Sequence, residues 1–354
     1  MQGEEKNMKG SNNKSQAIRV FKYIFMIVLV CYVVVYMPTP YIVYQPGSAE
    51  EVKPMITVKD GDSTEQGTFM MTTVSASYAN IALLAFSAFN SHAEVDKKES
   101  RLGDKSKEEY AAEQLFYMSD SQSSAVEAAY EEADVPYEIL TDYLFVFSTP
   151  KDSTNSQYFQ PGDKVLEVDS KPIGNNVDLA TLLKSKKIGD IVSVKLERAG
   201  KMIVEKVPLV SIQDSETNTT RPGLGIMIGA MQKVTAKDPQ KQVEFLNTKV
   251  GGPSAGLMFT MEIYNQLTPG DLSKGYRVAG TGTISADGTV GPIGGVRHKI
   301  VAADRENAQF FFVPKDNYKE AKTKADDIGT KMKLIPVSTL DDALHYMDQL
   351  QTTS

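Results

Sequence analysis

Hydrophobic and polar positions follow different periods in three parts of this chain. The first part holds an uncharged apolar run, Tyr23–Met37, between a polar stretch and the sequence Pro-Thr-Pro. The middle part, 135–210, has short period-two runs around one helical pattern. The last part alternates strand and helix periods up to residue 350. These patterns predict an α+β protein that follows one hydrophobic, membrane-inserting segment.

The apolar run predicts a membrane anchor, although alone it is shorter than the ~20 residues that cross a bilayer, which leaves room for a cleaved signal peptide. Apolar residues in 17–21 extend it if Arg19 and Lys22 reach toward water, and no small-residue cleavage pattern directly follows it. Basic residues on its N-terminal flank orient that end toward the cytoplasm. We therefore expect a disordered cytoplasmic tail over 1–16, an uncleaved span over 17–37 and an extracellular chain thereafter.

Residues 41–130 carry shorter patterns. Residues 41–75 predict short strands interrupted by proline and glycine turns. The apolar run Ala79–Phe89 predicts a buried helix, because it is too short for a second span. The charged stretch 93–109 predicts a solvated linker or an exposed helix, and 109–133 predicts a helix.

Residues 135–210 predict a separate unit of strands, turns and one helix. The helix is expected over 176–184, with Asp178 or Asn176 as its cap and three leucines on one face: Leu179, Leu182 and Leu183. The later run Gly223–Gly229 is interpreted as a strand entry that packs in a sheet, because no Gly-Lys-Ser/Thr follows to make a phosphate loop.

Composition excludes several classes of function. The 354 residues carry a net charge of −7 and give a pI near 5.2, so nucleic-acid binding is not expected. The single cysteine, Cys31, lies in the apolar run, and the three histidines have no metal-ligand spacing. We expect neither a metal nor a cofactor.

One serine lies in a setting that suits a nucleophile. The sequence at 250–256 is Val-Gly-Gly-Pro-Ser-Ala-Gly. Pro253 suits the first helical position, which would place Ser254 in the first turn, where unpaired N–H groups can stabilise an oxyanion. Gly251 and Gly252 would let a substrate backbone approach closely. The alternative is that this segment only begins a helix.

One lysine has the pattern of a buried base. A helix is predicted over 296–306, and Lys299 lies on its apolar face. Burial would lower the lysine pKa from about 10.4 toward neutrality and make it a usable general base. His298 should point elsewhere, toward the surface, because neighbours on a helix diverge by about 100°.

The phrases GGPSAG, GTGTISADGTVGPIGGVRHK and FFFVP resemble the proteolytic domain of Lon-type serine peptidases. The resemblance implies Ser254 as nucleophile, Lys299 as general base and Thr281 as a hydroxyl that orients the lysine amine. The backbone at Gly251, Gly252 and Ser254 would contact the oxyanion or the substrate. ATP-dependent Lon has an acidic residue where this chain has Gly251, and no Walker motif occurs here.

The phrases PGDKVLEVDSKPI and DLATLLKSKKIGDIVSVKLERAG resemble a PDZ domain, which would hold an extended peptide by strand addition. The Gly-Leu-Gly-Phe loop of that family is not visible at 142–147, so the unit could also be a spacer without a ligand.

The order of segments resembles the ATP-independent, membrane-anchored, PDZ-containing Lon-like proteases of Gram-positive bacteria. It implies an N-terminal part of the peptidase domain at 41–130, a PDZ domain at 131–212 and the Ser-Lys proteolytic domain at 213–354. The expected function is cleavage of extracellular or cell-surface peptides or proteins, secreted signalling peptides among them. The sequence is compatible with a homo-oligomer and does not determine the oligomeric state. The alternative function is a catalytically silent, membrane-tethered PDZ adaptor.

Overall fold

The computed structural model describes residues 4–150, 153–213, 219–246 and 251–352, with side chains from Arg19 onward. The chain forms two compact units, residues 1–46 with 75–104 and residues 47–74 with 105–354. Strands β1 (Pro38–Glu51) and β3 (Thr68–Asn80) have residues in both units. The segment 41–130, expected as one part of the peptidase domain, is therefore divided between the two.

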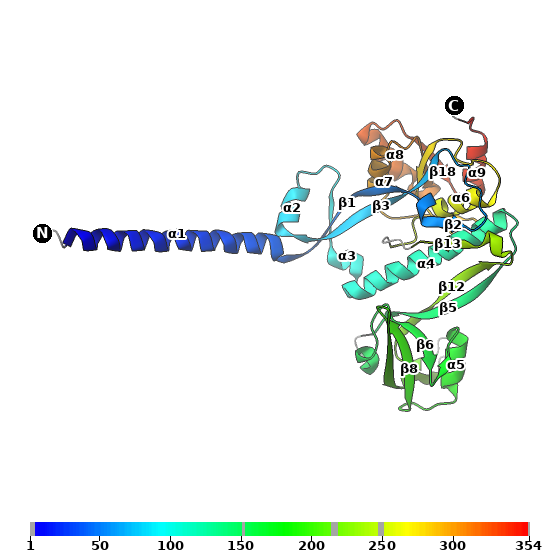
Figure 1. Ribbon diagram of the computed structural model, residues 1–354, viewed down its shortest axis with the longest axis horizontal. Coiled ribbons are helices and arrows are strands. Elements are labelled where there is room, and N and C mark those ends of the chain that lie inside the picture. The colour runs from blue at the N-terminus through cyan, green and yellow to red at the C-terminus, as the bar shows by residue number, and fades with distance from the viewer. Residues whose placement is uncertain (1–3, 151–152, 214–218, 247–250, 353–354) are drawn as a thin grey trace. The chain divides into compact units, whose positions relative to one another are not determined.

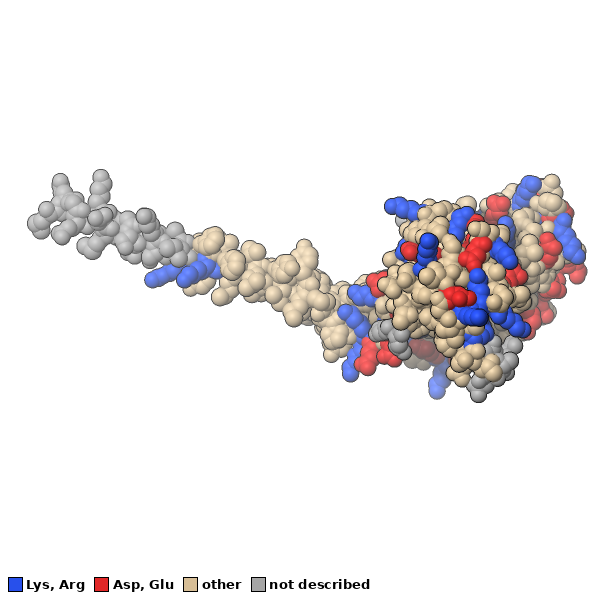
Figure 2. Space-filling model, turned by 90° about the horizontal axis from the view of Figure 1, so that it is seen from below, with Lys and Arg blue, Asp and Glu red and all other residues tan. Residues whose placement is uncertain are grey.

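The first unit contains a long helix and a small group of short elements. Helix α1 spans Glu4–Tyr36, so it begins inside the tail that the sequence analysis expected to be disordered. Its window Arg19–Tyr36 is long and apolar enough to cross a membrane, as an anchor or as part of a signal sequence. Figure 2 shows basic side chains at the start of this window, followed by an uncharged stretch. The short elements are α2 (Ile81–Ser87), β4 (Glu94–Lys97), which pairs antiparallel with β1, and α3 (Lys98–Leu102).

Helix α2 is exposed, which contradicts the predicted burial of residues 79–89. Phe86 and Phe89 are 77% and 92% exposed. The run is apolar, but α2 has only seven residues, and Ser87 is the one among them that is buried.

The second unit is built on a sheet in which β18 (Lys333–Val337), β17 (Phe310–Pro314), β14 (Arg277–Gly280) and β3 run parallel. Neighbouring side chains of a strand point to opposite faces, so Met71 packs in one core and Met70 in another. The first core includes α4 (Lys107–Glu132), α6 (Gly256–Leu267) and α9 (Leu340–Asp348). The second includes α7 (Val296–Arg305) and α8 (Tyr318–Ile328), which Figure 1 shows together.

A smaller sheet corresponds to the predicted PDZ unit. Its strands, in spatial order, are β12 (Met227–Ala236), β5 (Tyr137–Ser148), β6 (Lys164–Val168), β8 (Ile191–Arg198) and β9 (Lys201–Pro208), with β7 (Lys171–Pro172) on β6. Helix α5 spans Asn176–Lys184 as predicted, but its cap is Asn175, whose side chain accepts from the Asp178 amide. The short pairs are β10 (Val210–Gln213) with β11 (Thr220–Gly223), β2 (Ile56–Val58) with β13 (Val243–Phe245), and β15 (Thr283–Ile284) with β16 (Val290–Gly291).

Strands β5 and β12 form a ribbon that joins the two cores of this unit (Figure 1). Val234 and Ala236 of β12 are buried in the larger core, whereas Ile228 and Ala230 pack against the core of the smaller sheet. The smaller sheet therefore includes a strand that lies beyond the expected range 131–212.

Helix α6 buries an acid among apolar side chains. Glu262 is fully buried; one carboxylate oxygen accepts from Gln266 Nε2 at 2.6 Å, and the other has no hydrogen-bond partner. Burial, reinforced by the nearby Glu65 carboxylate, raises the pKa of Glu262 to about 8.

The buried acid predicts that stability falls as the pH rises toward 8. The unfolded chain releases this proton near pH 4.5 and the folded chain holds it to about pH 8. Between these values the free energy of unfolding should fall by up to about 1.4 kcal/mol per pH unit relative to Glu262→Gln. Urea unfolding of both proteins from pH 5 to 8 measures the difference, with Glu320→Gln at an exposed position as the control. A constant difference between Glu262→Gln and the parent would contradict this account.

Candidate active site

Ser254 lies two residues before helix α6, not in its first turn as predicted. The helix begins at Gly256, with Ala255 as its N-cap. The Gly282 amide donates to the Ser254 carbonyl at 2.9 Å, and the Leu257 amide donates to the Gly282 carbonyl at 3.2 Å. Because these bonds engage the backbone around Ser254 with the end of the neighbouring strand, the helix starts later and the serine is held in a fixed turn.

Lys299 projects from the first turns of α7 toward this serine. Its Nζ lies 2.9 Å from Ser254 Oγ and donates to the Thr72 carbonyl at 2.5 Å. The lysine is 3% exposed, and burial lowers its pKa to about 7. Near neutral pH a large fraction of this amine is therefore uncharged, and its lone pair can accept the proton of the serine hydroxyl.

Thr281 is at the site, but its hydroxyl is hydrogen-bonded to the serine turn and not, as expected, to the lysine amine. Its hydroxyl donates to the Ser254 carbonyl at 2.9 Å. The partner that orients the lysine amine is the Thr72 carbonyl of β3. The Thr281 hydroxyl instead supports the backbone of the serine turn, together with the Gly282 amide.

The two glycines before the serine differ in their surroundings. Gly251 is exposed, and Gly252 is buried with φ +92°. The Gly252 amide donates to the Gln114 carbonyl of α4 at 3.0 Å, so in this structure it is not available to an oxyanion. Within the described ranges, the amides of Ser254 and Ala255 donate to no other group. These two amides, beside the start of α6, are the better oxyanion donors.

Three residues of the site escaped the sequence analysis. Thr72 and Gln114 act through backbone carbonyls, which every residue type carries, so their identity gives no signal. Ser121 of α4 donates to the Pro253 carbonyl at 3.0 Å, and one polar position in a helix is weak evidence.

His298 is buried, which contradicts its predicted surface position. It is 3% exposed. Helix α7 packs against the sheet on one side and α8 on another, so it has buried residues around most of its circumference.

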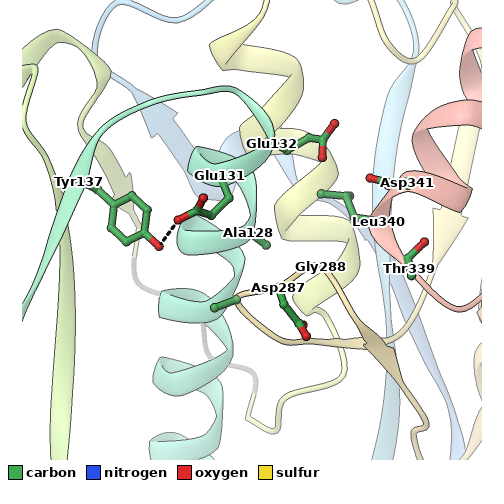
Figure 3. Close-up of a pocket in the computed structure, with 10 residues that line it drawn as sticks. Ala128, Glu131, Glu132, Tyr137, Asp287, Gly288, Thr339, Leu340 and Asp341 are labelled. Carbon is green, nitrogen blue, oxygen red and sulfur yellow. Dashed lines mark hydrogen bonds between the residues drawn. The ribbon is translucent and has the colours of Figure 1, made fainter.

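A separate acidic cavity of about 550 Å³ lies between α4, the β15–β16 turn and α9 (Figure 3). Glu131, Glu132, Asp287 and Asp341 line it, and Tyr137 donates to Glu131 at 2.8 Å. Burial and then Asp341 raise the pKa of Glu132. Because no predicted catalytic residue lines this cavity, it is distinct from the serine–lysine site.

A second candidate site lies on the smaller sheet. Strand β12 is at the end of the sheet order and directly follows the run Gly223-Leu224-Gly225-Ile226. In the part of the chain that the structure describes, the amides of Leu224, Gly225 and Ile226 donate to no other group. This run was predicted to pack in a sheet. Its sequence, Gly-Leu-Gly-Ile, differs by one residue from the Gly-Leu-Gly-Phe that is not found at 142–147.

The apolar floor beside β12 comes from two elements. Ile226 and Ile228 are partly exposed and pack against the same core as Leu182 of α5. An open strand edge, free amides at one end and an apolar floor are the features that strand addition by an extended peptide requires.

Two stretches of the chain match known families. Residues 247–349 match the Lon protease (S16) C-terminal proteolytic domain, and residues 143–209 match the PDZ domain. Both stretches agree with the two units expected from the sequence motifs. The predicted fold class, an α+β chain with a Lon-type proteolytic domain and a PDZ domain, is thereby confirmed.

Curated Lon proteases resemble part of this chain. The Lon protease of Azospirillum brasilense is 39% identical over 99 residues, which are 28% of this chain and 12% of that protein. The peroxisomal Lon protease homolog 2 of Caenorhabditis elegans is 32% identical over 177 residues, 49% of this chain and 21% of that protein. The matched part thus spans between about a tenth and a fifth of these relatives.

Among solved structures, the PDZ domain of the SdrC-like protein from Listeria monocytogenes is 24% identical, with a TM-score of 0.22 over 25% of this chain and 87% of that one. The corresponding domain from Listeria innocua is 25% identical, with a TM-score of 0.22 over 25% of this chain and 93% of that one.

Proposed function

Because this chain joins a Lon-type proteolytic domain to a PDZ domain, we propose that it is a membrane-anchored, ATP-independent serine endopeptidase with Ser254 and Lys299 as its catalytic dyad. The observation that carries the proposal is the 2.9 Å separation between Lys299 Nζ and Ser254 Oγ, at a lysine whose pKa burial lowers to about 7.

The geometry supports the following reaction. Lys299 Nζ takes the hydroxyl proton as Ser254 Oγ attacks a peptide carbonyl, and the amides of Ser254 and Ala255 stabilise the resulting oxyanion. The lysine then gives the proton to the leaving amine, which departs and leaves an acyl ester on Ser254. Lys299 Nζ then takes a proton from a water molecule, whose oxygen attacks the acyl ester. The lysine returns this proton to Ser254 Oγ as the acid product leaves, so that the serine hydroxyl and the neutral lysine amine are restored.

Substrates would be extracellular or cell-surface peptides and proteins, secreted signalling peptides among them. Helix α1 would anchor the chain with its N-terminus in the cytoplasm, since Arg19 and Lys22 lie at the N-terminal start of the apolar window. The PDZ unit would hold an extended segment of the substrate along β12, with the three amides at 224–226 available to a terminal or side-chain carboxylate.

The competing function is a catalytically silent adaptor that acts only by binding peptides. The free amides and open edge of β12 would serve it equally well. The short Ser254–Lys299 contact favours the enzyme, because burial of a lysine beside a serine is costly to stability and has no use in an adaptor.

Removal of either dyad residue should abolish cleavage. We expect Ser254→Ala and Lys299→Ala each to lower kcat/KM by about 10³-fold or more, because nucleophile and base act as one unit. Digestion of casein by the full chain in detergent micelles, followed by mass spectrometry, measures the rate. Lys324→Ala is the matched control, since Lys324 is also buried but pairs with Asp327 on α8. Full activity in both dyad variants would leave only the adaptor.

The rate should rise with pH through about 7. Protonated Lys299 cannot accept a proton, so activity is lost as the pH falls through its pKa of about 7 and is present above it. A profile of kcat/KM from pH 5 to 9 should therefore show one acid limb near pH 7. A rate that still climbs tenfold per pH unit from pH 8 to 9 would contradict a base with a pKa of about 7.

The open edge of β12 and the apolar floor beside it should matter for long substrates only. Ile228→Glu introduces a charge into the apolar floor and should raise KM for a protein substrate without changing hydrolysis of a short peptide that occupies the dyad alone. Met227→Glu is the control, because Met227 is 53% exposed and, unlike Ile228, is not among the described residues that pack against the core of the smaller sheet. Equal effects of both variants would rule out the edge of β12 as the binding site.

A further inference from the structure

The first unit presents an uncharged surface next to the membrane-length part of α1. Residues 75–93 contain no aspartate, glutamate, lysine or arginine. Within this stretch, α2 and the turn after it expose Phe86 and Phe89, at 77% and 92%. Phenylalanine exposed to this extent on a short helix marks an interaction surface when several such side chains lie together.

Asn80 fixes where this surface lies along α1. Its Nδ2 donates to the Val35 carbonyl at 2.6 Å, and its Oδ1 accepts from the Leu83 amide at 2.7 Å. Val35 is in the last turn of α1, whose carbonyls lack partners within the helix. One side chain therefore caps the end of α1 and the start of α2. The Thr39 hydroxyl adds a second connection by donating to the Ala79 carbonyl at 2.6 Å.

These bonds place α2 at the level where α1 would leave the bilayer. No residue of the Arg19–Tyr36 window is buried within the chain itself, as is expected of a lipid-facing surface. Ile81, the first residue of α2, directly follows Asn80, whose side chain is hydrogen-bonded to the last turn of α1. The apolar surfaces of α1 and α2 are therefore adjacent, and a bilayer that surrounds α1 would also reach α2.

We propose that Phe86 and Phe89 insert into the interfacial layer of the same bilayer that α1 spans, so that α2 lies along the membrane surface. This inference rests on the proposed anchoring by α1. Aromatic side chains are favoured at the membrane interface. A short apolar segment that is tethered beside a membrane-spanning helix is also held at a high effective concentration near the bilayer, which strengthens its insertion.

Hydrophobic insertion, not charge attraction, holds the segment. The neighbouring residues 90–104 carry three basic and four acidic side chains, so they are not attracted to anionic lipid. The basic residues are Lys97, Lys98 and Arg101, and the acidic residues are Glu94, Asp96, Glu99 and Asp104. The depth of Phe89 should therefore be the same in zwitterionic vesicles and in vesicles with anionic lipid.

Fluorescent labels on single cysteines test the depth directly. The full chain with Cys31→Ser is reconstituted in phosphatidylcholine vesicles and labelled at Phe89→Cys, at Val28→Cys in α1, or at Val177→Cys on α5. Val177 is 72% exposed and is the aqueous control. A nitroxide near the headgroup end of the lipid chains should quench the label at 89 and spare the label at 177, and iodide in the water should do the reverse.

Phe86→Ser provides a second readout. It should lower lipid quenching at position 89 and raise quenching by iodide, whereas Val95→Ser, at an exposed apolar position in β4 of the same unit, should change neither.

The other outcomes overturn the inference in recognisable ways. If the label at 89 responds to iodide and not to the lipid nitroxide while the label at 28 responds to a nitroxide deeper in the chains, α1 spans the bilayer and α2 does not insert. Protection of position 89 from both quenchers would mean that a protein surface, such as a second copy of the chain, covers it. If the label at 28 is not quenched by lipid, the proposed anchoring itself fails.

Discussion

The cost of burying one amine determines much of this structure. Lys299 is nearly inaccessible to water, and neutralisation near pH 7 is how such a group avoids the full cost of a buried charge. The Thr72 carbonyl supplies the remaining polar contact and lies on β3, in the parallel sheet, while Ser254 lies at the entry to α6. Three segments distant in sequence must therefore dock correctly before the pair exists, which couples the proposed chemistry to complete folding of the larger core.

Burial of the lysine also explains why the serine turn is so strongly hydrogen-bonded. The carbonyl of Ser254 accepts from both the Gly282 amide and the Thr281 hydroxyl, and the Pro253 carbonyl accepts from Ser121. A serine in a flexible turn would exchange the lysine contact for water, and the amine would regain its proton. The bonds leave the amides of Ser254 and Ala255 available, so the turn is held by its carbonyls and presents its N–H groups to a reacting oxygen.

The sequence was sufficient where one residue type has one physical meaning. Lys299 on an apolar helical face could be predicted because a charged residue among apolar neighbours is conspicuous, and helix α7 begins at the predicted residue. The position of Ser254 relative to α6 could not be predicted, because it depends on backbone bonds to Gly282, which lies between β14 and β15. Thr72 acts through its carbonyl, which no side-chain pattern encodes. Helix α2 was predicted to be buried in a protein core because an apolar sequence does not distinguish burial by protein from burial by lipid.

The ribbon of β5 and β12 connects the two proposed sites through packed side chains. Each of its strands contributes residues to both cores of the second unit, so the edge of β12 that would bind peptide continues into the layer next to α4. The same α4 provides the Gln114 carbonyl that occupies the Gly252 amide. A peptide added to β12 would stiffen the ribbon against α4, and α4 contacts the serine turn through Gln114 and Ser121. Substrate binding at the PDZ unit thus has a contiguous packed route to the turn that carries Ser254, and a double-mutant cycle between the two sites would measure whether energy passes along it.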